Sequence, residues 1–142
     1  PCNPAVPVTG AVILVACSLV YTPCLYVAIS VVPPYSSFLI LLYKMLSAVP
    51  AGAKIVVMDE RGKPLSSEKF ARRLGGWQDE SVPAVVFLIG GADGHTEEIR
   101  KKADMILAFG EMTWPHMLAR VMLAEQIYRA KTILDGHPYH RA

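Results

Sequence analysis

The residues best suited to chemistry gather at the end of the chain, in His137-Pro138-Tyr139-His140-Arg141. A terminal segment normally frays, but one so dense in hydrogen-bonding and cationic groups could instead close over a site. The two histidines are separated by a proline and have no cysteine nearby, so they form no convincing metal site. No Ser/His/Asp order stands out in the chain either, and nucleophilic catalysis of the triad type is therefore unsupported.

A glycine-rich segment, residues 90–94 (GGADG), directly follows the apolar run Val85–Ile89. Glycine admits tight turns and lets another group come close to the backbone, so this position suits a bound ligand. The segment is neither a Walker A loop nor a G-x-G-x-x-G fingerprint. Taken alone it indicates a binding loop only weakly, and an ordinary turn is the alternative.

A third candidate is the segment 109–116 (FGEMTWPH), which connects the apolar run Met105–Phe109 to the longest expected helix. Pro115 suits the first helical position, because its missing N–H would be unpaired there. The helix should run to about Leu134 and end at Gly136. A strand that leads through a loop into a helix N-terminus is where α/β folds place ligands, although a plain connection is the alternative.

The elements that must position these segments alternate from Lys44 onward. A strand over 53–58 should end in the polar turn 59–64, and Ser66 or Ser67 should cap a helix that runs to about Leu74 before two glycines. The strand 85–89 is apolar on both faces, as in a parallel sheet covered by helices. Thr96 should cap a short helix over 97–102. This alternation predicts an α/β domain with a mostly parallel sheet and helices on both faces.

The long helix is apolar almost all round in its first three turns. Such a helix is usually buried on more than one side, here by the sheet and by a second subunit. Glu125 and Arg129 stand four apart in the favourable order. They are either a surface ion pair or, among so many apolar neighbours, a structural or active-site pair.

The first 43 residues contain no charged side chain and no histidine, although the whole chain carries a formal charge of only +2. We expect a strand at 11–16 and a helix opening at 38–43. Pro23 and the pair Pro33-Pro34 cut this tract into pieces too short to span a bilayer, so no membrane segment is predicted. The odd number of cysteines, 3, excludes a complete disulfide framework and favours a reducing compartment, the cytoplasm.

Five segments taken together resemble the ribosomal large-subunit methyltransferase H family: 58–63 (MDERGK), 88–94 (LIGGADG), 112–116 (MTWPH), 123–130 (LAEQIYRA) and 137–141 (HPYHR). Members of this family are SPOUT-class enzymes that methylate N3 of a pseudouridine in 23S rRNA. The resemblance covers roughly residues 44–142 of a single domain over 1–142. Residues 1–43 do not match, because the family has an opening strand and a charged amphipathic helix there.

The resemblance implies a C-terminal trefoil knot, S-adenosyl-L-methionine as the methyl donor, and an obligate homodimer that acts on 23S rRNA without a metal. The donor site would comprise Met58, Gly90 and the loop Phe109, Gly110, Glu111, Met112, Thr113 and Trp114. Tyr139, His140 and Arg141 would reach toward the partner subunit's site.

Methyl transfer to a ring nitrogen requires the N3 proton to leave. We expect His140 to remove it, Arg141 or Arg129 to stabilise the anionic base, and Tyr139 to orient or stack on it. Phosphate contacts would come from Arg61, Lys63, Arg72, Arg73, Lys101 and Lys102. Two other readings are a SPOUT enzyme that acts on another RNA such as tRNA, and a non-catalytic nucleotide-binding dimer.

Overall fold

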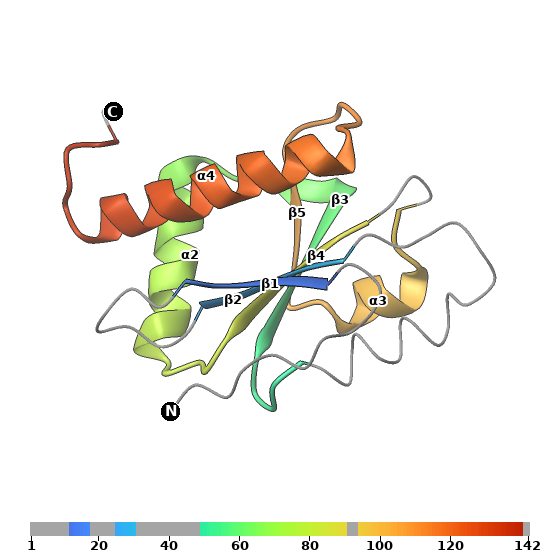
Figure 1. Cartoon of the computed structure of the whole chain (residues 1–142), viewed down its shortest axis with the longest axis horizontal. Coiled ribbons are helices and arrows are strands. Elements are labelled where there is room, and N and C mark those ends of the chain that lie inside the picture. The colour runs from blue at the N-terminus through green and yellow to red at the C-terminus, as the bar shows by residue number, and fades with distance from the viewer. Residues whose placement is uncertain (1–11, 18–24, 31–48, 91–93, 141–142) are drawn as a thin grey trace.

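The computed structural model describes residues 12–17, 25–30, 49–90 and 94–140. Its main sheet has three parallel strands in the order β4 (Val85–Ile89), β3 (Lys54–Pro64) and β5 (Met105–Ala108) (Figure 1). The strands β1 (Val12–Cys17) and β2 (Leu25–Ser30) form a separate antiparallel pair, with β2 close to β4. The predicted strand at 11–16 is therefore present, one residue later. The helix expected to open at 38–43 lies outside the described residues.

Helices cover both faces of the three-stranded sheet. On one face α2 (Ser67–Asp79) and α4 (His116–Leu134) bury Phe70 and Leu123 against Val56 and Phe87. On the other face α3 (Glu97–Lys102) buries Ile99 against alternate residues of the same strands. Successive strand residues point to opposite faces, so β4, with all five residues buried, is packed from both sides. The predicted α/β class, with a parallel sheet covered on both faces, is confirmed.

The expectation that the first strand of the sheet ends at Met58 is wrong, because β3 continues to Pro64. Met58 and Lys63 are both opposite Leu107 on β5, so the residues between them bulge out of the ladder before pairing resumes. Gly62 permits this, since a Cβ there would lie only 2.7 Å from the backbone carbonyl carbon of Leu107. The polar segment 59–62 is therefore held on both sides by strand pairing.

The helix α2 was expected to stop at the glycine pair, and this is also wrong, because it passes through Gly75 and Gly76 to Asp79. Trp77 is only 5% exposed, and its burial beyond the glycines favours continuing the helix. Gly75 also leaves room for Leu134 of α4, whose Cδ2 would lie 2.9 Å from a Cβ at that position. Tertiary packing thus outweighs the low helix propensity of glycine. The predicted cap is confirmed at Ser66, which accepts a hydrogen bond from the Lys69 amide.

The ends of α4 match the prediction within one residue. Pro115 is the N-cap rather than the first helical residue, and β5 stops at Ala108. Gly136 has φ +66, and the amides of Gly136 and His137 donate to Ile133 and Thr132, which is the Schellman arrangement. Thr96 occupies the N-cap of α3 but makes no side-chain cap hydrogen bond. None of the helices within the described ranges is long and apolar enough to cross a membrane.

Candidate functional site

A cleft of about 350 Å³ lies where the carboxyl ends of the three parallel strands meet. Met58 ends the first part of β3, Gly90 follows β4, and the loop after β5 closes the third side. Of the residues predicted to bind the donor, the structure brings these together in its lining: Met58, Gly90, Phe109, Gly110, Met112, Thr113 and Trp114. Glu111 is exposed and is not part of the lining. We call this the donor cleft.

Two glycines give the donor cleft its shape. A Cβ at Gly90 would lie 3.1 Å from the Gly94 carbonyl carbon and 3.2 Å from the His95 ring, so Gly90 is in close contact with Gly94 and His95. Gly110 has φ +122, a conformation that L side chains rarely adopt. The following loop is tied to the β3 bulge, because the Thr113 hydroxyl donates to Glu60 Oε2 at 3.3 Å. A close backbone approach at Gly90 and a positive φ at Gly110 thus shape two sides of the cleft.

An ion pair in the donor cleft, between Asp59 and Arg100, was not predicted. Arg100 Nη1 donates to Asp59 Oδ2 at 3.1 Å, with side chains only 14% and 5% exposed. Burial acts to raise the pKa of Asp59, but hydrogen bonds from the Arg61 amide and the Arg100 guanidinium outweigh it, and the pKa lies below its ordinary value. The two residues are far apart in sequence, and no local pattern marks them as partners. Their pairing links α3 to the start of the β3 bulge.

The imidazole of His95, which follows the same loop, is 8% exposed. Its Nε2 lies 3.2 Å from the Leu88 carbonyl oxygen, so this nitrogen carries the proton and donates. Burial lowers the pKa of His95 despite the nearby Asp59 carboxylate. Burial thus favours the neutral form of His95, whose hydrogen bond to Leu88 is a structural contact at the end of β4.

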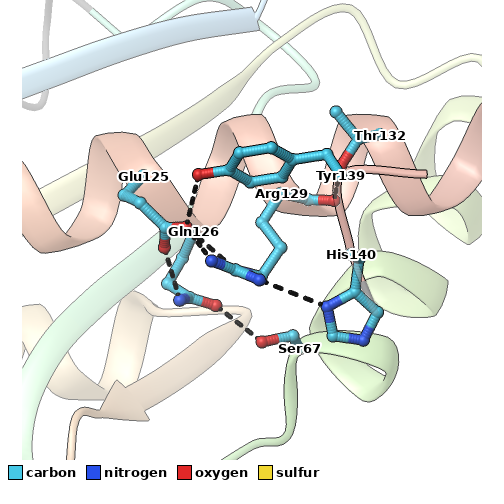
Figure 2. A network of polar contacts seen from close by, with 7 residues as sticks. All are labelled: Ser67, Glu125, Gln126, Arg129, Thr132, Tyr139 and His140. Atoms are coloured by element: carbon cyan, nitrogen blue, oxygen red, sulfur yellow. Dashed lines mark hydrogen bonds and ion pairs between the residues drawn. The ribbon is translucent and has the colours of Figure 1, made fainter. Parts of the chain in front are cut away.

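The predicted catalytic residues Arg129, Tyr139 and His140 form a second cluster with Glu125 (Figure 2). Arg129 Nε donates to Glu125 Oε1 at 2.9 Å, and its Nη2 donates to the same oxygen. The Tyr139 hydroxyl reaches that oxygen at 3.4 Å, and its ring lies 5.0 Å from the guanidinium carbon. Glu125 and Arg129 therefore form more than an isolated surface ion pair, because both also contact the C-terminal residues. Arg141, the fourth predicted catalytic residue, lies outside the described residues.

Both ring nitrogens of His140 are engaged within its own chain. Nδ1 lies 3.3 Å from Arg129 Nη1, and Nε2 lies 2.9 Å from Glu68 Oε1. Because a guanidinium only donates, Nδ1 accepts and Nε2 carries the proton toward the carboxylate. Hydrogen bonds from the Ser66 hydroxyl and then from His140 hold the pKa of Glu68 at about 2. We call the cluster of Glu125, Arg129, Tyr139 and His140 the tail cluster, and none of its residues lines the donor cleft.

A larger cleft, of about 740 Å³, lies between the start of α2 and the middle of α4. It shares residues 107–110 with the donor cleft, and we call it the second cleft. Ser67, Glu125 and Gln126 form its polar end, and the Ser67 hydroxyl donates to Gln126 Oε1 at 2.9 Å (Figure 2). Glu125 thus belongs both to this cleft and to the tail cluster.

Comparison with known proteins places the chain in a family of methyltransferases. A family model described as "Predicted SPOUT methyltransferase" matches residues 41–140, and the chain belongs to this family. It is 65% identical over 98 residues to the ribosomal RNA large subunit methyltransferase H of Rhodospirillum centenum, covering 69% of this chain and 64% of that relative.

Proteins of the same name from Rhodopseudomonas palustris strain BisA53 and Paramagnetospirillum magneticum are 60% and 56% identical. Those alignments cover 69% and 68% of this chain, and 61% and 64% of the relatives. The chain thus spans less than two thirds of the length of these relatives. The resemblance inferred from the five segments is confirmed.

Proposed function

We propose that this chain is a SPOUT methyltransferase that transfers a methyl group from S-adenosyl-L-methionine to N3 of a pseudouridine in the 23S rRNA of the large ribosomal subunit. One observation carries the proposal: three segments assigned to the donor by resemblance converge, in the structure, on one cleft at the carboxyl edge of the sheet. The relatives named as rRNA large subunit methyltransferases support the substrate class.

The donor cleft suits S-adenosyl-L-methionine in both chemistry and position. Met58, Ile89 and Leu107 give it apolar walls, while Asp59, Arg61 and Thr113 add polar side chains to its lining. When bound, the donor supplies an electrophilic methyl group on a sulfonium. The protein's contribution is then chiefly to hold the acceptor nitrogen in line with that methyl group.

The N3 proton of the acceptor has to leave, and His140 remains our proposed base. In the described arrangement its Nδ1 accepts from Arg129 and its Nε2 carries a proton. His140 can act as a base only after the Arg129 contact is exchanged for the substrate. Arg129 or Arg141 would then stabilise the negative charge on the pseudouridine ring, and Tyr139 would orient this ring. We propose that this exchange occurs when the tail meets the partner subunit's donor cleft.

The exposed apolar side chains of α4 support a homodimer. Met117, Val121 and Tyr128 are 59%, 65% and 52% exposed, and Leu118 is 44% exposed. Trp114 and Met112, which line the donor cleft, are 37% and 69% exposed. Large apolar side chains gathered on one helix favour burial against another protein surface. A second copy of the same helix satisfies this on both subunits at once.

Two further parts of the proposal rest on membership of the family. We propose that the chain between β3 and α4 forms a trefoil knot, which mechanical unfolding from the two ends would reveal as a contour length shorter than the chain allows. We also propose that the protein acts in the cytoplasm, where ribosomes are its substrate.

Cations that could contact rRNA phosphates lie on several elements. Arg61 lines the donor cleft, and Lys63 is exposed on the same bulge. Arg72 is exposed on α2, where the neighbouring Arg73 stacks 5.6 Å over the Trp77 ring. Lys101 and Lys102 are exposed at the end of α3, on the opposite face of the sheet. We propose that those nearest the donor cleft make the phosphate contacts.

The test is methyl transfer from labelled S-adenosyl-L-methionine to 70S ribosomes from a strain that lacks the modification, followed by nucleoside mass spectrometry. We expect 3-methylpseudouridine in the 23S fraction. Purified tRNA is assayed in parallel, and label there instead would assign another RNA substrate. Donor binding without transfer to either RNA would favour the non-catalytic dimer.

A further inference from the structure

The second cleft has walls suited to a flat ring and one polar end. Phe70, Phe109, Leu65, Val121 and Met122 supply apolar and aromatic surface, and Ser67, Glu125 and Gln126 supply hydrogen-bonding groups. Its wall at residues 107–110 is also a wall of the donor cleft. A planar ligand in the second cleft would therefore lie next to a donor bound at the carboxyl edge of the sheet.

The side-chain amide of Gln126 has one orientation in this cleft. Gln126 Nε2 lies 2.6 Å from Glu125 Oε2. Because a carboxylate only accepts, the NH₂ end of the amide must face Glu125. The amide oxygen then accepts from the Ser67 hydroxyl at 2.9 Å (Figure 2). Glu125 is itself held by Arg129 from the next turn of α4. An amide nitrogen carries two hydrogens and an amide oxygen two lone pairs, so one donor and one acceptor remain for a ligand.

This donor and acceptor pair matches one edge of pseudouridine. The ring of pseudouridine is joined to its sugar through carbon, so N1 carries a hydrogen beside the C2 carbonyl. In uridine N1 is bonded to the sugar and has no hydrogen to donate. The N3 edge must stay free to face the methyl donor, which leaves N1–H and C2=O as the edge that an amide can bind through two hydrogen bonds.

We propose that the second cleft holds the target base and that Gln126 distinguishes pseudouridine from uridine by accepting from N1–H and donating to the C2 carbonyl. Ser67 and Glu125 act as positioning residues that fix the direction of the amide. This inference rests on the proposed function, since it assigns the acceptor site of that reaction.

The test compares Gln126→Met with the wild-type protein on two kinds of ribosome, with and without the pseudouridine at the target position. Gln78→Met is the matched control, because Gln78 is the other glutamine of the chain and is exposed on α2. We expect the wild-type protein and the control to prefer the pseudouridine ribosomes strongly. Gln126→Met should lower kcat/KM on these ribosomes roughly 10- to 100-fold, because both hydrogen bonds to the base are lost. On uridine ribosomes its kcat/KM should fall less than on pseudouridine ribosomes, because only the hydrogen bond to the carbonyl is lost there, and donor affinity should match that of the control.

Ser67→Ala is a second variant, which leaves the amide in place but removes the group that orients it. It should reduce the preference for pseudouridine less than Gln126→Met does. Equal losses of Gln126→Met on both ribosomes, or an unchanged preference, would overturn the assignment of Gln126 while leaving the methyltransferase activity intact. A wild-type protein that methylates both ribosomes equally would overturn it too. A wild-type protein that binds the donor and methylates neither would overturn the proposed function and this inference together.

Discussion

Gly62 lies where the β3 bulge returns to the sheet, and adding one methyl group there should disturb both the fold and the donor cleft. A Cβ at Gly62 would lie 2.7 Å from the Leu107 carbonyl carbon, against the 3.4 Å at which ordinary contact begins, so it falls about 0.7 Å short. The neighbouring atoms at 2.8 and 2.9 Å also belong to backbone, that of Ile106, and cannot rotate away. Gly62→Ala should therefore lower the free energy of unfolding by about 1–3 kcal/mol.

Gly76→Ala is the matched control for this prediction. No heavy atom lies within 4 Å of a Cβ at Gly76, and the residue is inside α2. The added methyl group should raise the free energy of unfolding by about 0.5–1 kcal/mol, because alanine loses less backbone entropy in a helix than glycine does. Both variants add one methyl group at a glycine. Their free energies of unfolding therefore compare a crowded position with an open one.

Urea unfolding at one fixed protein concentration, approached from both the folded and the unfolded side, measures the two free energies. Calorimetric titration with S-adenosyl-L-methionine gives the second readout. Because Leu107 lines both clefts, Gly62→Ala should also weaken donor binding, whereas Gly76→Ala should not. A Gly62→Ala protein as stable as the wild type within about 0.5 kcal/mol would refute the close approach of the bulge to β5.

Three other perturbations test the tail cluster and the proposed dimer. His140→Ala should leave donor affinity nearly unchanged and reduce turnover on ribosomes about 100-fold or more, as expected on losing a general base; undiminished turnover would remove His140 from the reaction. Val121→Glu places a charge at a 65% exposed apolar position of α4 and should yield a monomer by light scattering, while an unchanged dimer mass would exclude this face from the interface. The Ser66 hydroxyl and then His140 hold the pKa of Glu68 at about 2, below its ordinary 4.5, so Glu68 contributes stability above pH 4.5 that is lost as the pH falls toward 2. In Glu68→Gln the free energy of unfolding should depend less on pH between 4.5 and 2 than it does in the wild type. If the variant shows the same pH dependence as the wild type, the pKa of Glu68 is not lowered by these contacts.

Local patterns predicted much of the main sheet. The strand β4 was marked by a run of five apolar residues, and α4 by its proline at one end and its glycine at the other. The family resemblance assigned Met58, Gly90 and the 109–114 loop to one site, and these segments line one cleft because parallel strands present their carboxyl ends at one edge. These features depend on neighbours in the chain and on one general rule of sheet topology.

The features that were not predicted depend on partners far away in the sequence. The continuation of β3 beyond Met58 depends on pairing with β5, and the continuation of α2 beyond its glycines depends on packing against Leu134. The ion pair of Asp59 with Arg100 joins residues that are 41 positions apart, and the contact of Ser67 with Gln126 joins residues 59 apart. Propensity and spacing carry no record of such contacts, because each is decided by how the elements pack.

The shared wall of the two clefts explains how a short strand can organise a reaction between two ligands. β5 has only four residues, of which Leu107 and Ala108 are 5% and 7% exposed, and the chain leaves it through the positive φ of Gly110. Residues 107–110 line both the donor cleft and the second cleft. Because Leu107 and Ala108 are packed into the core, this wall moves little, and two ligands that contact it keep a fixed separation. In the proposed reaction, the cost of orienting the methyl group and the acceptor nitrogen is therefore met largely by folding, before either ligand binds.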